Sequence, residues 1–340
     1  MTAIGMKQSF KLEEGNHFIA LESDNAMPQG YDIRVAVAAS GVNPIDMKRR
    51  LAPLAEGASR ILGFDAVGVV EAVGDKVTEF REGDWVYYAG SVMRPGSNQT
   101  HQLVDARLVS KKPDTVSIAE AASLPLTGLT ASEVLFDIFG ISKNAEENAG
   151  QSILIINGAG GVGSMAIQIA KAYGLHVIAT ASRDASVEWV KEMGADLVLN
   201  HREDLTAQMV DQYPALVNYV FCAFNTDAYF ESMVACAKPR GRLATIVEFS
   251  ERQDLNLLKA KSLSFTYESM FTRAQFETSD IEMQRTYLED IREKIDAGIY
   301  KPTLTETLSG LTPDTIYEAH QRIASQNMIG KLVIQFENES

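Results

Sequence analysis

The residues with the clearest chemical potential form a glycine-rich string at positions 157–163, N-G-A-G-G-V-G. Gly158, Gly160 and Gly163 fit the pattern G-x-G-x-x-G, which here follows an apolar run and opens a predicted helix. In that context the first glycine permits a tight turn, the second lets backbone amides approach a pyrophosphate, and the third lets the helix pack on the strand. The string therefore predicts a dinucleotide site at a helix N-terminus; the alternative is a glycine-rich turn without a ligand.

The residues after the second predicted strand, 176–181, indicate which dinucleotide is bound. A site that prefers NAD carries a carboxylate about 20 residues after the glycine string. This chain has Ser182 and Arg183 there, and the first carboxylate is Asp184. A hydroxyl and a forked guanidinium suit a 2′-phosphate, so we expect NADPH. The alternatives are a helix N-cap for Ser182 and a solvated surface charge for Arg183.

From residue 127 onward, strand-like and helix-like segments alternate. Short runs rich in apolar residues predict six strands, at 152–156, 176–181, 197–199, 219–222, 243–247 and 263–267. Helical patterns at 162–173 and 184–193 supply crossovers between them. We therefore expect an α/β fold with a doubly wound parallel sheet over residues 127–274.

In the region before residue 127, apolar and polar residues alternate with the two-residue period of strands. Residues 33–39 alternate as a half-buried strand does, and glycines inside strand-like runs favour the bulges and corners of a small curled sheet or barrel. The tail predicts helices over 281–297 and 316–324 and a last strand over 330–334. We expect it to rejoin the first domain, which then comprises residues 1–126 and 275–340.

Length and charge bear on the number of domains and on the kinds of partner that the protein can bind. The chain has 340 residues, enough for about two domains. Lysine and arginine number 31 against 45 acidic residues, and the net charge of −14 argues against nucleic-acid or anionic membrane partners. Two cysteines build no disulfide framework. No apolar stretch approaches a membrane span and the N-terminus lacks a signal-peptide run, so we expect a cytoplasmic protein.

Several motifs in order resemble one known family, the medium-chain dehydrogenase/reductase superfamily, in its zinc-free quinone-oxidoreductase branch. The similar segments are 41–46 (G-V-N-P-I-D), 62–68 (L-G-F-D-A-V-G), 81–84 (R-E-G-D), 124–127 (L-P-L-T), the glycine string, 193–196 (M-G-A-D) and 330–331 (G-K). The resemblance covers essentially the whole chain. It implies a GroES-like β-barrel-type domain and a Rossmann domain, with the active site in the cleft between them.

The chain departs from the zinc-dependent members of this family at the positions of their zinc ligands. Zinc-dependent relatives carry Cys where this chain has Asn43 and a His-Glu pair where it has Phe64 and Asp65. Phenylalanine cannot ligate zinc, and an amide is a poor zinc ligand. The five histidines are dispersed, at positions 17, 101, 176, 201 and 320, and the structural-zinc cysteine cluster is absent. We expect no metal.

Without a Lewis acid, quinones and α,β-unsaturated carbonyls are better hydride acceptors than a simple carbonyl is. The resemblance thus implies an NADPH-dependent, metal-independent reductase of quinones or enones, acting on a small molecule and forming a homodimer through an edge strand at 263–267. Two alternatives stay open. One is an NADPH-binding sensor or interaction protein without catalysis, and the other is a zinc-dependent alcohol dehydrogenase.

The resemblance also implies four catalytic residues. Asn43 lies at the family's cleft asparagine, with an Asn-Pro turn as its alternative. Asp46 either positions the side of the cleft that carries Asn43 or caps a helix over 47–51. Lys48 stands near a tyrosine that several relatives use as proton donor; its alternative is a solvated basic turn with Arg49 and Arg50. Thr127 resembles a nicotinamide contact or belongs to a backbone turn.

Further coenzyme contacts come from the same resemblance. Gly160, Gly161 and Val162 are expected at the pyrophosphate, with Gly158 and Gly163 in the same string. Ser182 and Arg183 are placed at the 2′-phosphate, and His201 falls where relatives carry a tyrosine near the adenosine. The remaining contacts are three aromatic residues that follow predicted strands and one near-terminal lysine: Phe224, Phe249, Phe271 and Lys331.

Overall fold

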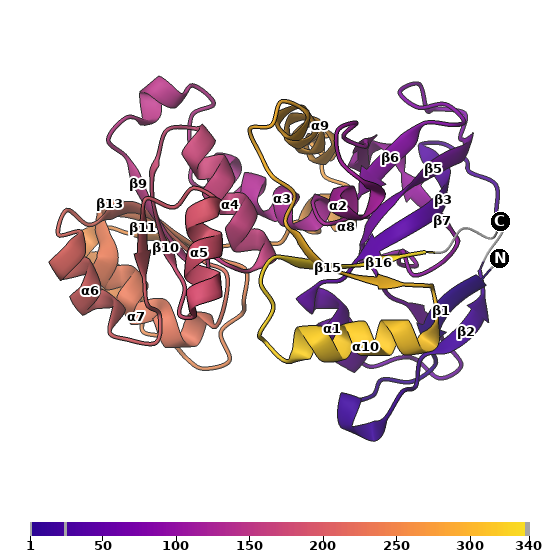
Figure 1. Ribbon diagram of the computed structural model, residues 1–340, viewed down its shortest axis with the longest axis horizontal. Helices are drawn as coiled ribbons and strands as arrows, with labels where there is room; N and C mark the ends of the chain where they lie inside the picture. The colour runs from indigo at the N-terminus through magenta and orange to yellow at the C-terminus, as the bar shows by residue number, and fades with distance from the viewer. Residues whose placement is uncertain (1, 24–25, 337–340) are drawn as a thin grey trace. The chain divides into compact units, whose positions relative to one another are not determined.

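A computed structural model describes residues 2–23 and 26–336 of the chain. The chain divides into two compact units, residues 1–126 together with 271–340, and residues 127–270 (Figure 1). Within the described residues, no helix combines the length and the apolar character that a membrane crossing requires.

The second unit is built on a six-stranded parallel sheet in the order β11-β10-β9-β12-β13-β14. The strands are β9 (Ser152–Ile156), β10 (His176–Thr180), β11 (Leu197–Leu199), β12 (Val217–Cys222), β13 (Ala237–Thr245) and β14 (Ser264–Tyr267). All six predicted strands are therefore confirmed. The chain order reverses direction between β9 and β12, which is the topological switch point where doubly wound sheets bind ligands.

One strand boundary differs from the prediction. Strand β13 begins at Ala237, six residues before the predicted start, because Ala237 pairs with Val217 and the ladder resumes at Arg242 opposite Tyr219. The intervening Pro239 and Gly241 have the sequence character of a turn. They lie in a bulge inside the strand, so pairing continues on both sides of it.

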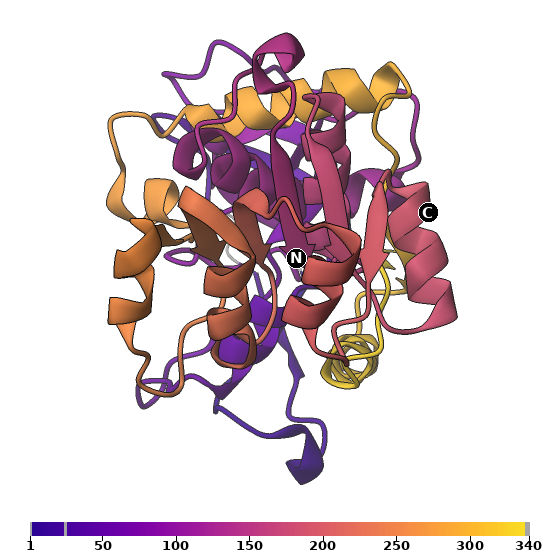
Figure 2. The same ribbon diagram turned by 90° about the vertical axis from the view of Figure 1, so that its left-hand side faces the viewer.

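Helices connect these strands. They are α4 (Gly161–Ala172), α5 (Asp184–Glu192), α6 (Leu205–Gln212) and α7 (Thr226–Cys236). Helices α4 and α5 lie side by side, and the indole Nε1 of Trp189 donates to Ser164 Oγ across them at 2.8 Å. Helices α6 and α7 also pack together. Figure 2 shows the same helices and strands after a turn of 90°.

The first unit contains a three-stranded sheet, β2-β1-β4, and a seven-stranded sheet with the path β15-β16-β3-β5-β6-β8, in which β7 also pairs with β3. The strands are β1 (Thr2–Met6), β2 (Ile19–Glu22), β3 (Asp32–Gly41), β4 (Arg60–Ile61), β5 (Asp65–Val73), β6 (Trp85–Tyr88), β7 (His101–Asp105), β8 (Val109–Lys111), β15 (Leu304–Ser309) and β16 (Lys331–Gln335). Because β16 pairs antiparallel with β3, the C-terminal segment completes a sheet that begins near the N-terminus.

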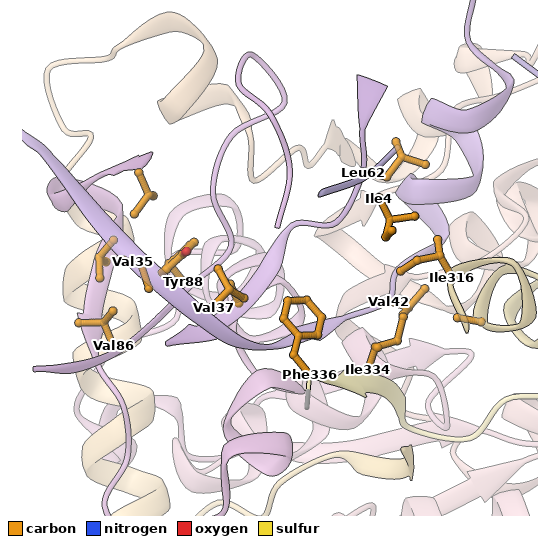
Figure 3. Close-up of a cluster of buried hydrophobic side chains, with 14 of the residues drawn as sticks. Ile4, Val35, Val37, Val42, Leu62, Val86, Tyr88, Ile316, Ile334 and Phe336 are labelled. Atoms are coloured by element: carbon orange, nitrogen blue, oxygen red, sulfur yellow. The ribbon is translucent and has the colours of Figure 1, made fainter. Parts of the chain in front are cut away.

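Alternating side chains of these strands form an apolar core (Figure 3). Val35 and Val37 of β3 face Val86 and Tyr88 of β6, and Ile334 of β16 lies in the same cluster. The predicted alternation at 33–39 is thus confirmed as burial of every second residue in the first half of β3.

The helices of this unit are α1 (Pro44–Leu51), α2 (Ile118–Ala122), α8 (Thr272–Phe276), α9 (Met283–Asp296) and α10 (Pro313–Ala324), while α3 (Pro125–Ser132) runs across the boundary between the units. Helix α1 packs on α10 (Figure 1). Arg50 of α1 is 4% exposed; its Nε donates to the carbonyl of Phe10 at 3.1 Å, and its Nη1 lies 3.2 Å from His320 Nδ1. The reading of residues 48–50 as a solvated turn is therefore wrong for Arg50, because distant segments supply acceptors for its guanidinium. Burial, and then the Arg50 charge, lowers the pKa of His320 to about 3.

Candidate functional site

The glycine string forms a turn that is anchored to the neighbouring strand. Asn157 N donates to Thr180 Oγ1 at 2.9 Å, and Gly158 N donates to the Thr180 carbonyl at 3.0 Å. The left-handed residue of the turn is Asn157, with φ of 67°, rather than a glycine. Thr180 ends β10, so this strand holds the turn at the carboxyl edge of the sheet.

The three motif glycines meet different surroundings. A Cβ on Gly158 would lie 2.9 Å from Ala179 Cβ, and one on Gly163 would lie 2.4 Å from the Asn157 carbonyl oxygen. A Cβ on Gly160 would meet nothing closer than the side-chain amide of Asn157, at 3.1 Å. Close packing therefore requires Gly158 and Gly163, whereas Gly160 leaves the backbone open to a ligand.

Helix α4 begins directly after Gly160, which is its N-cap. Within the helix, Ser164 N donates to the Gly160 carbonyl at 2.8 Å. The amides of the first turn of an α-helix have no partners within the helix, and the helix dipole makes this end positive. Gly161 and Val162, both partly exposed, carry such amides. This arrangement can bind a phosphate or pyrophosphate.

Arg183 and His201 lie at the ends of adjacent strands, β10 and β11. Arg183 is the N-cap of α5, and its N–H donates to Ser186 Oγ at 3.0 Å. The N-cap alternative for Ser182 is therefore wrong, because the helix begins one residue later. His201 Nδ1 lies 3.1 Å from Thr180 Oγ1. Burial lowers the pKa of His201, and the charges of Arg202 and Arg183 lower it further.

The three aromatic residues expected at the coenzyme lie in different surroundings. Phe224 is 40% exposed after β12. The Phe249 ring stacks on Phe265 of β14, with centroids 5.4 Å apart. Phe271 belongs to the first unit, where its ring lies 4.8 Å from that of Phe64.

A second polar group lies buried in the first unit, around Asp65. Its Oδ2 accepts from Lys331 Nζ and from Asn43 Nδ2, each at 2.9 Å. Its Oδ1 accepts from the backbone amide of Leu126, at the start of α3, at 2.6 Å. The carboxylate is fully buried, and a Cβ on Gly41 would lie 2.8 Å from it. Gly41 therefore makes room for the charge.

Lys331 and Asn43 complete this group, which we name the Asp65 cluster and which comprises Asn43, Asp46, Asp65 and Lys331. The ammonium of Lys331 donates to Asp65 Oδ2, to Asn43 Oδ1 at 2.5 Å and to the Val42 carbonyl at 3.0 Å, which accounts for its three protons. The amide nitrogen of Asn43 also donates to the Gly41 carbonyl at 3.3 Å. The polar atoms expected to meet substrate or coenzyme thus already have partners within the protein.

Asp46 holds the start of α1 in place. Its Oδ2 accepts from Asn43 N at 2.9 Å and its Oδ1 from Gly63 N at 2.8 Å. Burial raises the pKa of this carboxyl to about 7, although the two backbone hydrogen bonds and the Lys331 charge act to lower it. Asp46 thus takes part in capping α1, but as the third residue of a helix that begins at Pro44 and has Asn43 as its N-cap, not as the cap of a helix over 47–51.

The other two catalytic candidates, Lys48 and Thr127, lie on helices α1 and α3. Lys48 is exposed on the last turn of α1. Thr127 is 2% exposed in the first turn of α3, directly after the Leu126 amide that binds Asp65.

Sequence reasoning missed the central role of Asp65. A signal was present, because the carboxylate stands inside the apolar segment 64–70 and a buried charge requires a partner. The partner, Lys331, lies 266 residues later.

The Asp65 cluster does not fit a zinc ion. Zinc needs three or four nitrogen, sulfur or oxygen donors that converge on it. Here Asn43 Oδ1 and Asp65 Oδ2 converge on the Lys331 ammonium, and Phe64 supplies no donor. Among residues 2–23 and 26–336, no group of three or more His, Cys, Asp or Glu is placed to hold a metal.

The parallel sheet with its glycine turn and the mainly antiparallel sheet of the other unit are those of a two-domain α/β fold with a Rossmann-type sheet. Residues 29–114 match the family model of the alcohol dehydrogenase GroES-like domain, and residues 161–284 match that of zinc-binding dehydrogenase. The zinc-type alcohol dehydrogenase-like protein of Staphylococcus epidermidis is 53% identical over 99% of this chain and 100% of its own length. The chain belongs to the medium-chain dehydrogenase/reductase superfamily, and the expected GroES-like and Rossmann-type folds are confirmed.

Two further similarities extend the comparison. The chloroplastic NADPH-dependent alkenal/one oxidoreductase of Arabidopsis thaliana is 34% identical over 61% of this chain and 55% of its own length. The structure of Escherichia coli quinone oxidoreductase complexed with NADPH has a TM-score of 0.83 at 26% identity, covering 98% of this chain and 100% of that one.

The substitutions Gly163→Ala and Gly160→Ala distinguish a glycine needed for packing inside the turn from a glycine needed for the approach of a dinucleotide. We expect Gly163→Ala to lower the free energy of unfolding by about 1–3 kcal/mol, because its methyl group would overlap the Asn157 carbonyl. Gly160→Ala should change it by less than about 1 kcal/mol and weaken dinucleotide binding at least tenfold. Urea unfolding and coenzyme titration measure both; parent-like stability of Gly163→Ala would contradict the packing role.

The substitution Asp65→Asn leaves the Lys331 ammonium buried without a counter-ion. We expect it to lower the free energy of unfolding by about 3–5 kcal/mol, and Asp65→Asn with Lys331→Met to recover part of that loss. The matched control is Asp280→Asn, since Asp280 pairs with Arg273 but is half exposed, and should cost less than about 1 kcal/mol. Equal effects of Asp65→Asn and Asp280→Asn would contradict the importance of burial.

Proposed function

We propose that this chain is an NADPH-dependent, metal-independent reductase of quinones or α,β-unsaturated carbonyls. The observation that carries the proposal is the engagement of Asn43 and Asp65 with the Lys331 ammonium, which leaves a donor set unsuited to zinc. Activated acceptors need positioning and hydrogen-bond donors more than a Lewis acid. The names of the Arabidopsis and E. coli relatives point to the same substrate classes.

The assignment of NADPH rests on the edge formed by β10 and β11. Arg183 lies at the end of β10 with Ser182 before it, and no carboxylate precedes Asp184 in that segment. A guanidinium in this place suits the 2′-phosphate, while the amides after Gly160 suit the pyrophosphate. His201 is a candidate for the adenosine side of the same edge, because it contacts Thr180 and feels the Arg183 charge.

The candidate residues of the first unit divide into two roles. We assign Asn43 and Asp46 a positioning role, since their polar atoms hold Lys331 and the start of α1. Thr127 and Lys48 are the candidates for contact with nicotinamide and substrate, and Lys48 is the exposed proton donor of the set. When bound, NADPH supplies the hydride; the protein supplies binding, orientation and the proton that completes the reduction.

A homodimer is part of the proposal. Strand β14 is the last strand of the parallel sheet, and a sheet edge offers backbone groups to a second copy. Its residue Tyr267 is 48% exposed, which provides apolar surface at this edge.

The direct test is NADPH consumption by the purified protein with a panel of quinones, enones and simple aldehydes. We expect turnover with the first two classes and little with the third, unchanged by a metal chelator. Tight NADPH binding without turnover on any acceptor would favour a sensor. Stoichiometric zinc whose removal abolishes activity would favour an alcohol dehydrogenase.

The substitution Arg183→Ala tests the choice of coenzyme. We expect NADPH to bind at least tenfold more weakly and NADH to change less than about threefold, because only NADPH carries the 2′-phosphate. Lys191→Ala, an exposed cation on the helix that Arg183 caps, is the control and should leave both affinities unchanged. Equal losses for the two coenzymes in Arg183→Ala would remove the assignment. Fluorescence titration measures the affinities of the parent and both variants for each coenzyme.

A further inference from the structure

A polar hollow lies at the amino ends of β12 and β13. It has a volume of about 210 Å³ and is lined by residues 218–219 and 238–242. In a parallel sheet all amino ends lie at one edge, and the glycine turn follows the carboxyl end of β9. Since dinucleotides bind outside the carboxyl ends, the hollow is separate from the coenzyme edge.

The hollow arises from an uneven strand pairing. Val217 pairs with Ala237 and Tyr219 with Arg242, so a single residue of β12, Asn218, faces four residues of β13, 238–241. The extra residues form a bulge, and bulges redirect side chains. A Cβ on Gly241 would lie 2.8 Å from the Lys238 carbonyl oxygen, which shows how tightly the bulge turns.

Three cations and no carboxylate line this hollow, in a chain whose net charge is −14. Lys238 Nζ donates to Asn218 Oδ1 at 3.1 Å. Arg242 Nη1 donates to the Phe139 carbonyl and, at 3.3 Å, to that of Ile138. These partners are neutral, and Lys238, Arg240 and Arg242 form no ion pair with a carboxylate in the described part of the chain. The positive charge of the hollow therefore has no carboxylate counter-ion among residues 2–23 and 26–336.

Arg240 adds backbone strain to this charge. Its φ is 66°, in the left-handed region that glycine adopts at no steric cost. A residue with a side chain is strained in this region, because its Cβ comes too close to the following carbonyl oxygen. The chain thus keeps an exposed guanidinium at a position where glycine would be more stable, and strain of this kind clusters at ligand sites.

We propose that this hollow binds a small phosphate-class oxyanion, as inorganic phosphate or as the phosphate group of a small metabolite. Two guanidinium groups and an ammonium match the oxygens and charge of a phosphate. Pockets for drug-sized ligands have about 300–1,000 Å³, so a volume of about 210 Å³ fits an ion or a small phosphomonoester rather than a dinucleotide. The site does not depend on the proposed reductase activity.

The experiment compares the parent protein with Arg240→Gly, Lys238→Met and the control Lys259→Met by isothermal titration calorimetry. The probes are inorganic phosphate and glycerol phosphate, at constant ionic strength set with chloride. Arg240→Gly removes the charge and the left-handed strain together, so it should fold at least as stably as the parent. Lys259 is an exposed cation of the same unit that does not line the hollow.

We expect saturable binding by the parent and Lys259→Met, and at least tenfold weaker binding by Arg240→Gly and Lys238→Met. Tighter binding of inorganic phosphate identifies the free ion as ligand, and tighter binding of glycerol phosphate identifies a phosphomonoester. Phosphate bound at the glycine turn would persist in Arg240→Gly, so equal affinity in all four proteins would overturn the proposal. The absence of saturable binding by the parent would overturn it as well.

Discussion

The buried ion pair between Asp65 and Lys331 is the constraint around which the polar interior of the first unit is arranged. Its two charged atoms lie 2.9 Å apart, and neither side chain is more than 4% exposed. Such a pair contributes little net stability, but either charge left alone is costly, so every nearby polar atom must support both. Asn43 bridges the pair, the start of α3 donates to the carboxylate, and the Val42 carbonyl accepts from the ammonium. Four segments distant in the chain thus meet with little freedom to move apart.

The second unit, by contrast, carries its candidate site in partly exposed residues. Its polar groups at the carboxyl edge are backbone amides at a helix start, together with partly exposed side chains such as Arg183 and His201. Amides that lack helical partners bind an anion from solution, whereas the Asp65 cluster satisfies its own charges within the protein. The second unit therefore offers backbone donors to a ligand, whereas the polar atoms of the Asp65 cluster are already paired within the first unit. This division fits the use of a soluble dinucleotide by a superfamily in which the chemistry comes from the coenzyme.

Prediction succeeded where the interaction that forms an element is local. The run 153–156 is apolar throughout and became most of the fully buried strand β9, and the glycine string became the turn that follows it. Prediction failed where a distant segment changes the environment. Arg50 looked like part of a solvated basic run, yet Phe10 and His320 enclose it, and β13 begins before the Pro-Arg-Gly bulge because β12 continues to pair with it.

The amino-acid pattern was sufficient for the strand–helix alternation and for the glycine turn, because periodicity and glycine spacing act over a few residues. The resemblance of several motifs in order was sufficient for the superfamily. The pattern was not sufficient for the Asp65–Lys331 pair, the enclosure of Arg50 or the cationic hollow at Arg240. These features depend on which segments approach one another in space. The attraction between two charges depends on the distance between them in space and not on their separation along the chain. A separation of 266 residues between ammonium and carboxylate leaves no local trace, so only the folded chain reveals that they meet.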